Sequence, residues 1–315
     1  MAARDEGGTV ADLGPVTLAF GVLLLVGGFA YAAAADLKNR EVSDVLWQVL
    51  GFAGFAVGLT AVAPGGALPV LLWCAVAALT LEHMFGWDSY LGRWSDSANL
   101  VELAAYVAVV AFVLIALDRV GLGASGVPVA VLALLVSVVF ARGLFEAGVL
   151  YGGADAKALM IAGLLVPMFP TPWVVGSSGT VLSVPAILPF PVDLLMNAAL
   201  ISVVIPIGIA VRNVLRGEFS LARGFTGYSL GVKELPDRFV WVRDRSLPSL
   251  AEREAAVETS AEDRRLRVEL ARELSQRGVR RVWVSPQLPF LVLMALGAVA
   301  ALLAGNLVID LLQWL

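Results

Sequence analysis

Long runs of uncharged apolar residues constrain this sequence most, because each is long enough to cross a membrane as a helix. Four such runs cover Pro15 to Ala35, Val45 to Ala63, Leu194 to Val211 and Leu288 to Val308. A hydrocarbon core of roughly 30 Å needs about 20 apolar residues in helical conformation. With 59% hydrophobic and only 15% charged residues, the chain lies outside the range of soluble proteins. The sequence therefore predicts an integral membrane protein.

Four weaker or shorter apolar runs raise the predicted number of helices to eight. They are Ala67 to Leu81, Asn99 to Leu117, Val127 to Leu150 and Ala158 to about Val175. The predicted fold class is an all-α polytopic membrane protein of about eight transmembrane helices with a small α+β cytoplasmic domain. The predicted domains are a membrane domain over 1–211 with helices 1 to 7, a cytoplasmic domain over 212–285, and a final transmembrane helix within 286–315.

The charged residues are concentrated in one stretch. Residues 212–285 hold 15 of the 22 Lys and Arg but only 11 of the 26 Asp and Glu. Loops rich in Lys and Arg stay in the cytoplasm, so this stretch is predicted to be cytoplasmic and both chain termini to lie outside the plasma membrane. Phe239 to Val242 and Val282 to Val284 are typical of strands, and Leu250 to Arg277, followed by Gly278, is typical of a helix.

The composition also excludes several classes of function. The sequence has one cysteine, Cys74, and one histidine, His83, which cannot supply a disulfide framework or a His/Cys metal cluster. With a net charge of −4, the chain lacks the excess of positive charge that is typical of nucleic-acid-binding proteins. We therefore expect no metal, no organic cofactor and no nucleic-acid partner.

Two carboxylates at predicted helix ends are the strongest catalytic candidates. Asp36 follows four alanines at the end of the first helix, and Asp155 begins a later helix. The predicted membrane topology places both at the cytoplasmic side. An ionisable group within a membrane helix costs free energy, so its presence indicates a functional role. Two carboxylates that share a water can divide acid and base work, which is the chemistry of aspartic proteases.

The residues around Asp155 allow two interpretations. Gly152 and Gly153 would let a substrate backbone approach closely, but a glycine pair before a helical aspartate is also common in a loop that caps a helix. Lys157 either favours the ionised form of the Asp155 carboxylate or extends its ammonium to the cytoplasmic membrane surface. Spacing alone does not decide between these interpretations.

A longer ordered pattern resembles a known family. Residues 35–44 read ADLKNREVSD and residues 152–157 read GGADAK. Further matching segments are Leu165 to Pro167, Phe190 and Pro191 with Asn197, Arg212 and Asn213, and Val282 to Pro289. In this order they resemble the archaeal type IV prepilin and preflagellin peptidases, a GxGD group of membrane aspartyl proteases.

The resemblance implies a site and a substrate. The two catalytic aspartates of the family correspond to Asp36 and Asp155, with Gly152, Gly153, Ala154 and Lys157 as the surrounding motif. Ala154 stands where the family has glycine. The family core of six helices implies that Ala67 to Leu117 is an inserted helical pair. The implied substrates are pilin and archaellin precursors, whose short basic leader is cut off at the cytoplasmic membrane face.

Several assignments remain open at the level of sequence. Glu41 and Asp44 either attract the basic leader or belong to the cap of helix 2, for which Ser43 is also suited. Arg142 and Glu146, four residues apart, are expected to pair with each other. Two other functions compete with the peptidase: a proton- or cation-coupled transporter that uses Asp36 and Asp155, and a noncatalytic scaffold of a surface-filament assembly.

Overall fold

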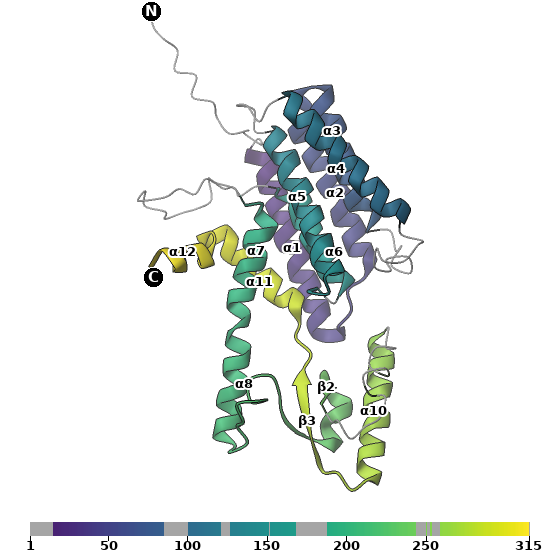
Figure 1. Cartoon of the computed structure of the whole chain (residues 1–315), viewed down its shortest axis with the longest axis vertical. Helices are drawn as coiled ribbons and strands as arrows, with labels where there is room; N and C mark the ends of the chain where they lie inside the picture. The colour runs from purple at the N-terminus through teal and green to yellow at the C-terminus, as the bar shows by residue number, and fades with distance from the viewer. Residues whose placement is uncertain are drawn as a thin grey trace, which may run out of the picture. The chain divides into compact units, whose positions relative to one another are not determined.

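The computed structural model in Figure 1 describes residues 15–84, 100–120, 127–150, 152–167, 188–243, 250, 253 and 259–314. Helices dominate these residues, and they include one small sheet. The chain divides into two compact units. The first unit comprises Met1–Ala34, Val42–Ala198 and Leu291–Leu315, and the second unit comprises Ala35–Glu41 and Ala199–Phe290.

Helices form the described part of the first unit. They are α1 (Pro15–Asn39), α2 (Asp44–Val62), the 3₁₀ helix η1 (Ala63–Gly65), α3 (Ala67–Glu82), α4 (Leu100–Val120), α5 (Val127–Glu146), α6 (Gly153–Leu165), α7 (Phe190–Ser202), α11 (Phe290–Ala304) and α12 (Leu307–Trp314). The ends of α1 and α7 extend into the second unit. Of the predicted run from Ala158 to about Val175, the residues up to Leu165 are helical and Val166 and Pro167 are not. Residues 168–187 lie outside the described part of the chain.

By length and composition, four helical segments in the described ranges can cross a membrane. They are Thr17–Asn39, Asp44–Gly65, Pro128–Glu146 and Phe190–Leu215. The bent pair α11 and α12 adds a fifth if it is counted as one span, whereas Ala67–Glu82 and Leu103–Asp118 are apolar but shorter. The helical membrane fold therefore has four or five candidate spans here, and the count of eight stays a prediction.

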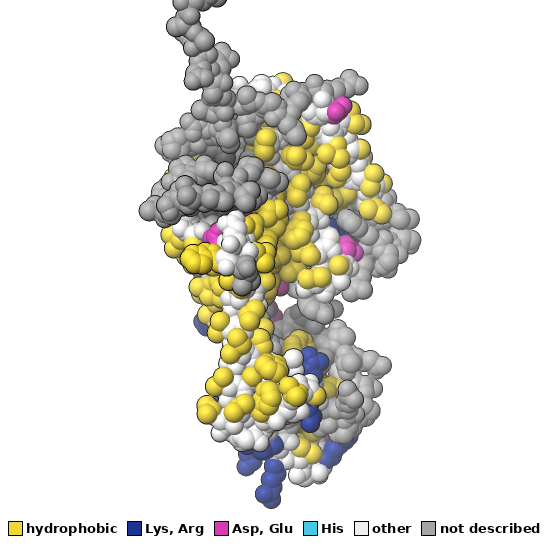
Figure 2. All heavy atoms as spheres, turned by 60° about the vertical axis from the view of Figure 1, so that its left-hand side comes forward, with side chains coloured by type: hydrophobic (Ala, Val, Ile, Leu, Met, Phe, Trp, Pro, Cys, Tyr) yellow, Lys and Arg dark blue, Asp and Glu magenta, His cyan; other side chains and the backbone are white. Residues whose placement is uncertain are grey.

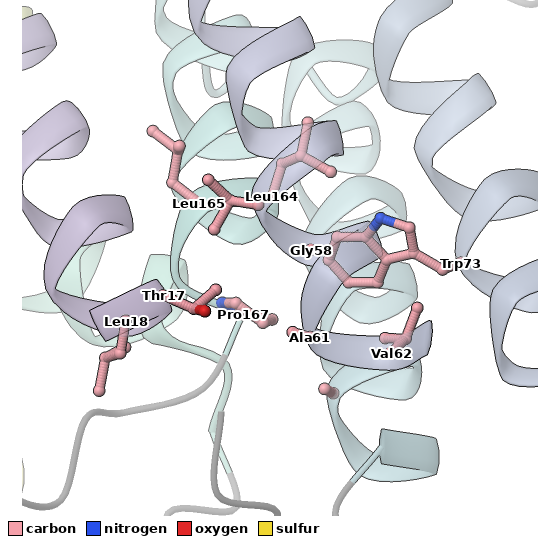
Figure 3. A pocket seen from close by; sticks show the side chains of 11 residues that line it. Thr17, Leu18, Gly58, Ala61, Val62, Trp73, Leu164, Leu165 and Pro167 are labelled. Atoms are coloured by element: carbon pink, nitrogen blue, oxygen red, sulfur yellow. The ribbon is translucent and has the colours of Figure 1, made fainter. Parts of the chain in front are cut away.

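Glycine residues allow the helices of the first unit to approach closely. The helices α2, α3, α5 and α6 pack on one another. A Cβ atom on Gly58 of α2 would lie 1.7 Å from the ring of Trp73 on α3, so the indole fills the space that a side chain would need. Figure 3 shows this ring beside Gly58. Close approach of this kind gives van der Waals contact where no hydrophobic effect joins helices in lipid.

The outward faces of these helices are apolar as well. Leu23, Val49, Phe52 and Ile115 are each more than half exposed. Figure 2 shows hydrophobic side chains over much of the visible face of the helices. Helices that are apolar on all sides are either buried in a large core or surrounded by lipid. The exposed apolar faces therefore agree with a membrane location.

The last apolar run is not one straight helix, which corrects the prediction for Leu288 to Val308. The helices α11 and α12 are bent by 62° relative to each other, and Gly305 at the break has a φ of 85°. The Asn197 side chain on α7 donates to the Gly305 carbonyl at 2.7 Å and accepts from the Leu307 N–H at 2.9 Å. The Asn306 side chain accepts from the next two N–H groups of α12, those of Val308 and Ile309. These side chains satisfy backbone groups that a bend leaves without helical partners.

The second unit contains a three-stranded antiparallel sheet and helices. Its described elements are α8 (Val204–Leu215), β1 (Tyr228–Gly231), the 3₁₀ helix η5 (Val232–Asp237), β2 (Val240–Val242), α10 (Ser260–Gln276) and β3 (Arg281–Pro286). The strand order is β1-β3-β2, with Ser229 opposite Trp283 and Trp241 opposite Ser285. The sheet confirms the two predicted strands and adds β1.

The core of the second unit lies between the sheet and α10. Leu266, Leu270 and Leu274 of α10 cluster with buried residues that include Val240 and Val284. Helix α10 begins at a capping box, in which the Thr259 hydroxyl accepts from the Glu262 N–H and the Glu262 carboxylate accepts from the Thr259 N–H. It ends before Gly278, whose φ of 77° suits glycine. Residues 251, 252 and 254–258 of the longer predicted helix lie outside the described ranges.

Candidate functional site

Asp36 lies in the last turn of α1 and belongs to the second unit. Its carboxylate Oδ1 is 3.8 Å from Nη1 of Arg40, and the side chain is 13% exposed. Arg40 leaves the helix with a φ of 60°, and its N–H donates to the Asp36 carbonyl at 3.1 Å. A carboxylate at a helix C-terminus is disfavoured by the helix dipole, and the nearby guanidinium offsets this effect.

Arg40 is itself held by an aromatic ring of the same unit. Its guanidinium carbon lies 4.9 Å from the ring centroid of Phe239, and Arg267 lies 5.3 Å from the same centroid. Burial lowers the pKa of the Arg40 guanidinium, and the charge of Asp36 partly opposes that shift. The sequence did not indicate the contacts of Arg40 with Asp36 and with Phe239. A positive φ at a non-glycine residue costs free energy, so side-chain contacts must hold Arg40 there.

Asp155 lies in the first turn of α6 and belongs to the first unit. Gly152 is the N-cap, and the Asp155 N–H donates to its carbonyl at 3.1 Å. A Cβ atom on Gly152 would lie 3.1 Å from Oδ2 of Asp155, so the carboxylate occupies the space beside this glycine. A helix N-terminus favours a negative charge at this position. The glycine here serves close approach, since its φ of −97° is open to other residues.

Ala154 occupies a helical position immediately before Asp155. It is the second residue of α6, which begins at Gly153. Alanine is favoured over glycine by about 1 kcal/mol in helical conformation. The departure from the family pattern is therefore compatible with the backbone found here.

Lys157 joins the start of α6 to the start of α2 within the first unit. Its Nζ atom is 2.8 Å from Oδ1 of Asp44; the Lys157 side chain is 4% exposed and the Asp44 side chain 42%. The N-cap of α2 is Ser43, whose hydroxyl accepts from the Val45 N–H. The Lys157 ammonium is thus buried in an ion pair with Asp44, a partner that neither interpretation of the sequence named.

The second predicted leader contact, Glu41, also has a partner inside its own unit. Its carboxylate accepts a hydrogen bond from the N–H of Ser260, the first residue of α10. That N–H has no acceptor within the helix, and an anion is stabilised at this end by the helix dipole. Glu41 is exposed, so this bond leaves the carboxylate accessible to solvent.

Further polar side chains are buried in the first unit near the start of α6. Arg142, with 1% of its surface exposed, pairs with Glu146 at 2.6 Å, as the sequence predicted. His83, which follows α3, hydrogen-bonds to Tyr106 on α4. Burial and the positive charges of Arg142 and Lys157 lower the pKa of His83 to about 3, so its imidazole is neutral near pH 7. No local pattern in the sequence indicated this grouping.

No metal cluster marks a site among the described residues, and the apolar pocket between α1, α2, α3 and α6 is small. No group of three or more His, Cys, Asp and Glu side chains in these ranges could hold a metal ion. The apolar pocket in Figure 3, between Thr17, Trp73 and Leu165, encloses about 20 Å³, which is room for little more than one water molecule. We regard that pocket as a packing gap.

The chain is similar to a known peptidase over part of its length. No protein-family model matches the chain. A preflagellin peptidase from Methanocaldococcus jannaschii is 26% identical over 165 residues, which cover 50% of this chain and 64% of that protein. The resemblance to preflagellin peptidases inferred from the motifs is thereby confirmed, while the match spans less than two thirds of the relative's own length.

Proposed function

We propose that this chain is a membrane leader peptidase that cuts the short basic leader from preflagellin-like or prepilin-like precursors. The similarity to a preflagellin peptidase over half of the chain carries this proposal. The helices that can cross a membrane support it, because such a precursor has a hydrophobic segment that lies in the bilayer. The expected cut is after the basic residues of the leader, at the cytoplasmic membrane face.

Asp36 and Asp155 are the proposed catalytic pair. One carboxylate takes a proton from water as the water oxygen attacks the carbonyl carbon of the scissile peptide. The protonated partner hydrogen-bonds the carbonyl oxygen, which stabilises the negative charge that develops there. The carbon–nitrogen bond then breaks as the leaving nitrogen accepts a proton. The pair is thus an aspartic-type endopeptidase site.

The local surroundings of each aspartate support this assignment separately. The Arg40 guanidinium lies near Asp36, and the absence of a side chain at Gly152 makes room for the Asp155 carboxylate. The ion pair between Lys157 and Asp44 fixes the first turn of α6, in which Asp155 lies. Side chains that hold a reacting group in place reduce the entropy lost on the way to the transition state.

Charge supports the choice of a basic leader. Glu41 lies five residues after Asp36 in the chain and is exposed, while Asp44 keeps 42% of its side chain accessible. Opposite charges raise the rate of encounter and orient a ligand before contact. We propose that these two carboxylates attract the basic residues of the leader toward the cut site.

Cleavage of a defined precursor tests this function. Membranes that contain the full chain are mixed with a precursor that carries a basic leader and a hydrophobic segment, and mass spectrometry locates the new N-terminus. We expect one cut after the basic residues, and a cleavage rate at least roughly tenfold lower when the leader Lys and Arg are changed to Gln. Membranes without the chain are the control. Absence of cleavage by well-expressed chain would contradict the peptidase and leave a transporter or scaffold.

A further inference from the structure

A basic cleft is formed within the second unit by residues far apart in the sequence. Its walls come from the end of α1, from η5, from the chain entering β2 and from α10, and it encloses about 920 Å³. The cationic residues that line it are Lys38, Arg238, Arg264, Arg265, Arg267 and Arg272, against two carboxylates, Asp237 and Glu269. The cleft therefore has an excess of positive charge. Figure 2 shows that Lys and Arg side chains also lie on the face of this unit that is visible there.

Most of these cations are available to a ligand. Arg267 is buried, pairs with Asp263 and stacks on Phe239. The remaining five are exposed, and in the described part of the chain none of them forms an ion pair. Arg264 and Arg272 are eight residues apart on α10, which places them on the same face of the helix. Five exposed cations against two carboxylates in the lining favour an anionic ligand.

The end of α1 indicates where this ligand is found. Lys38 and Asn39 line the cleft, and they are the last residues of the segment Thr17–Asn39, which is long and apolar enough to cross a membrane. The end of a spanning helix lies at the level of the lipid headgroups, where Lys and Arg interact with phosphate. A cleft that includes this helix end therefore opens at headgroup depth, whichever side of the membrane it faces.

We propose that the cleft binds the phosphate of an anionic membrane lipid. The cations that line the cleft would repel the basic leader of a precursor, so the leader is not the ligand of the cleft itself, although Glu41 is bonded to the lining residue Ser260. Charge complementarity favours a phosphate, and the position at the end of α1 favours a lipid as its source over a phosphate in solution. The site would hold α10 and the sheet against the membrane surface.

Lipid titration of the purified full chain tests the proposal. The chain in neutral detergent is titrated with phosphatidylglycerol, phosphatidylcholine or inorganic phosphate, and native mass spectrometry measures the bound ligand. Arg264→Gln/Arg272→Gln is compared with Lys233→Gln/Arg280→Gln, which removes the same charge from exposed residues outside the cleft. Arg264→Lys/Arg272→Lys keeps the charge.

The expected result is selective loss of the anionic lipid. Each cation near a membrane surface contributes about 1 kcal/mol, so we expect phosphatidylglycerol affinity to fall roughly tenfold to thirtyfold in the cleft variant and little in the other two. Equal affinity in the Gln variants of the cleft and of the control surface would overturn the site. Equal binding of phosphatidylcholine or of inorganic phosphate would overturn the anionic lipid as ligand. The readout needs no cleavage, so it is independent of the peptidase proposal.

Discussion

In the first unit, helices meet at glycines and bury a few paired charges, whereas in the second unit a small sheet and α10 close over aliphatic side chains and keep most charges at the surface. Gly58 against Trp73 and the buried Lys157 represent the first kind of packing. The capping box at Thr259 and the exposed pair of Arg277 with Glu273 represent the second. Stability should therefore depend on volume and buried charge in one unit and on local hydrogen bonds in the other.

The largest effect is expected from added volume in the first unit. Gly58→Ala places a methyl group 1.7 Å from the Trp73 ring, which must move. We expect a loss of about 3 kcal/mol, seen as a lower thermal midpoint in detergent. Gly143→Ala is the matched control, because nothing lies within 4 Å of a Cβ atom there. A similar loss in both variants would contradict the packing described for α2 and α3.

Buried charge should matter next. Asp44→Asn removes the carboxylate that pairs with the buried Lys157, and we expect a loss of about 2 kcal/mol, moderated because Asp44 is 42% exposed. Adding Lys157→Met should restore part of the stability. In the second unit, Glu273→Gln removes surface pairs and should cost less than about 1 kcal/mol. Equal losses from Asp44→Asn and Glu273→Gln would remove the contrast between the units.

Acid should weaken the first unit through His83. Its folded-state pKa of about 3 lies below the ordinary value of 6.5, so between these values the unfolded state binds the proton more readily. The contribution of His83 to the free energy of unfolding is therefore full above pH 6.5 and is lost as pH falls toward 3. Between pH 7.5 and 5.5 the loss is about 1.4 kcal/mol. The drop in thermal midpoint over this interval should shrink in His83→Gln. An unchanged drop would show that another group titrates.

A smaller and more local effect is expected in the second unit. Thr259→Ala removes the hydroxyl that accepts from the Glu262 N–H, which should cost about 1 kcal/mol. Amide exchange should accelerate at the start of α10 and stay unchanged in α5. Ser260→Ala, whose hydroxyl takes no part in the capping box, is the control. Exchange that accelerates throughout the chain would show that the two units are not separately stabilised.

The sequence predicted helices well where an apolar run and its end signals agree. Val45 to Ala63 was predicted and α2 covers Asp44–Val62, because Ser43 caps its start. The bend between α11 and α12 was missed, since it depends on Asn197 from α7. Strand β1 was also missed, because Tyr228–Gly231 is short and contains serine and glycine. Local patterns cannot report bonds between distant segments.

The candidate site shows the same limit. The motifs at Asp36 and Asp155 could be read from the sequence because each is a short continuous segment. The contacts of Arg40 with Phe239 and of Lys157 with Asp44 could not, because each joins residues far apart along the chain. In both cases a charged side chain near the aspartate is placed by tertiary packing.

Cleavage by aspartate variants tests whether Asp36 and Asp155 form the catalytic pair. Membranes with equal amounts of wild type, Asp36→Asn, Asp155→Asn and the control Asp310→Asn are given the same basic-leader precursor, and the rate of appearance of the new N-terminus is measured. Asp310 is exposed on α12 and has no role in the proposed chemistry. We expect wild-type cleavage in Asp310→Asn and a loss of at least about a thousandfold in both other variants. Undiminished cleavage in Asp36→Asn or Asp155→Asn would remove that residue from catalysis and contradict the aspartyl pair.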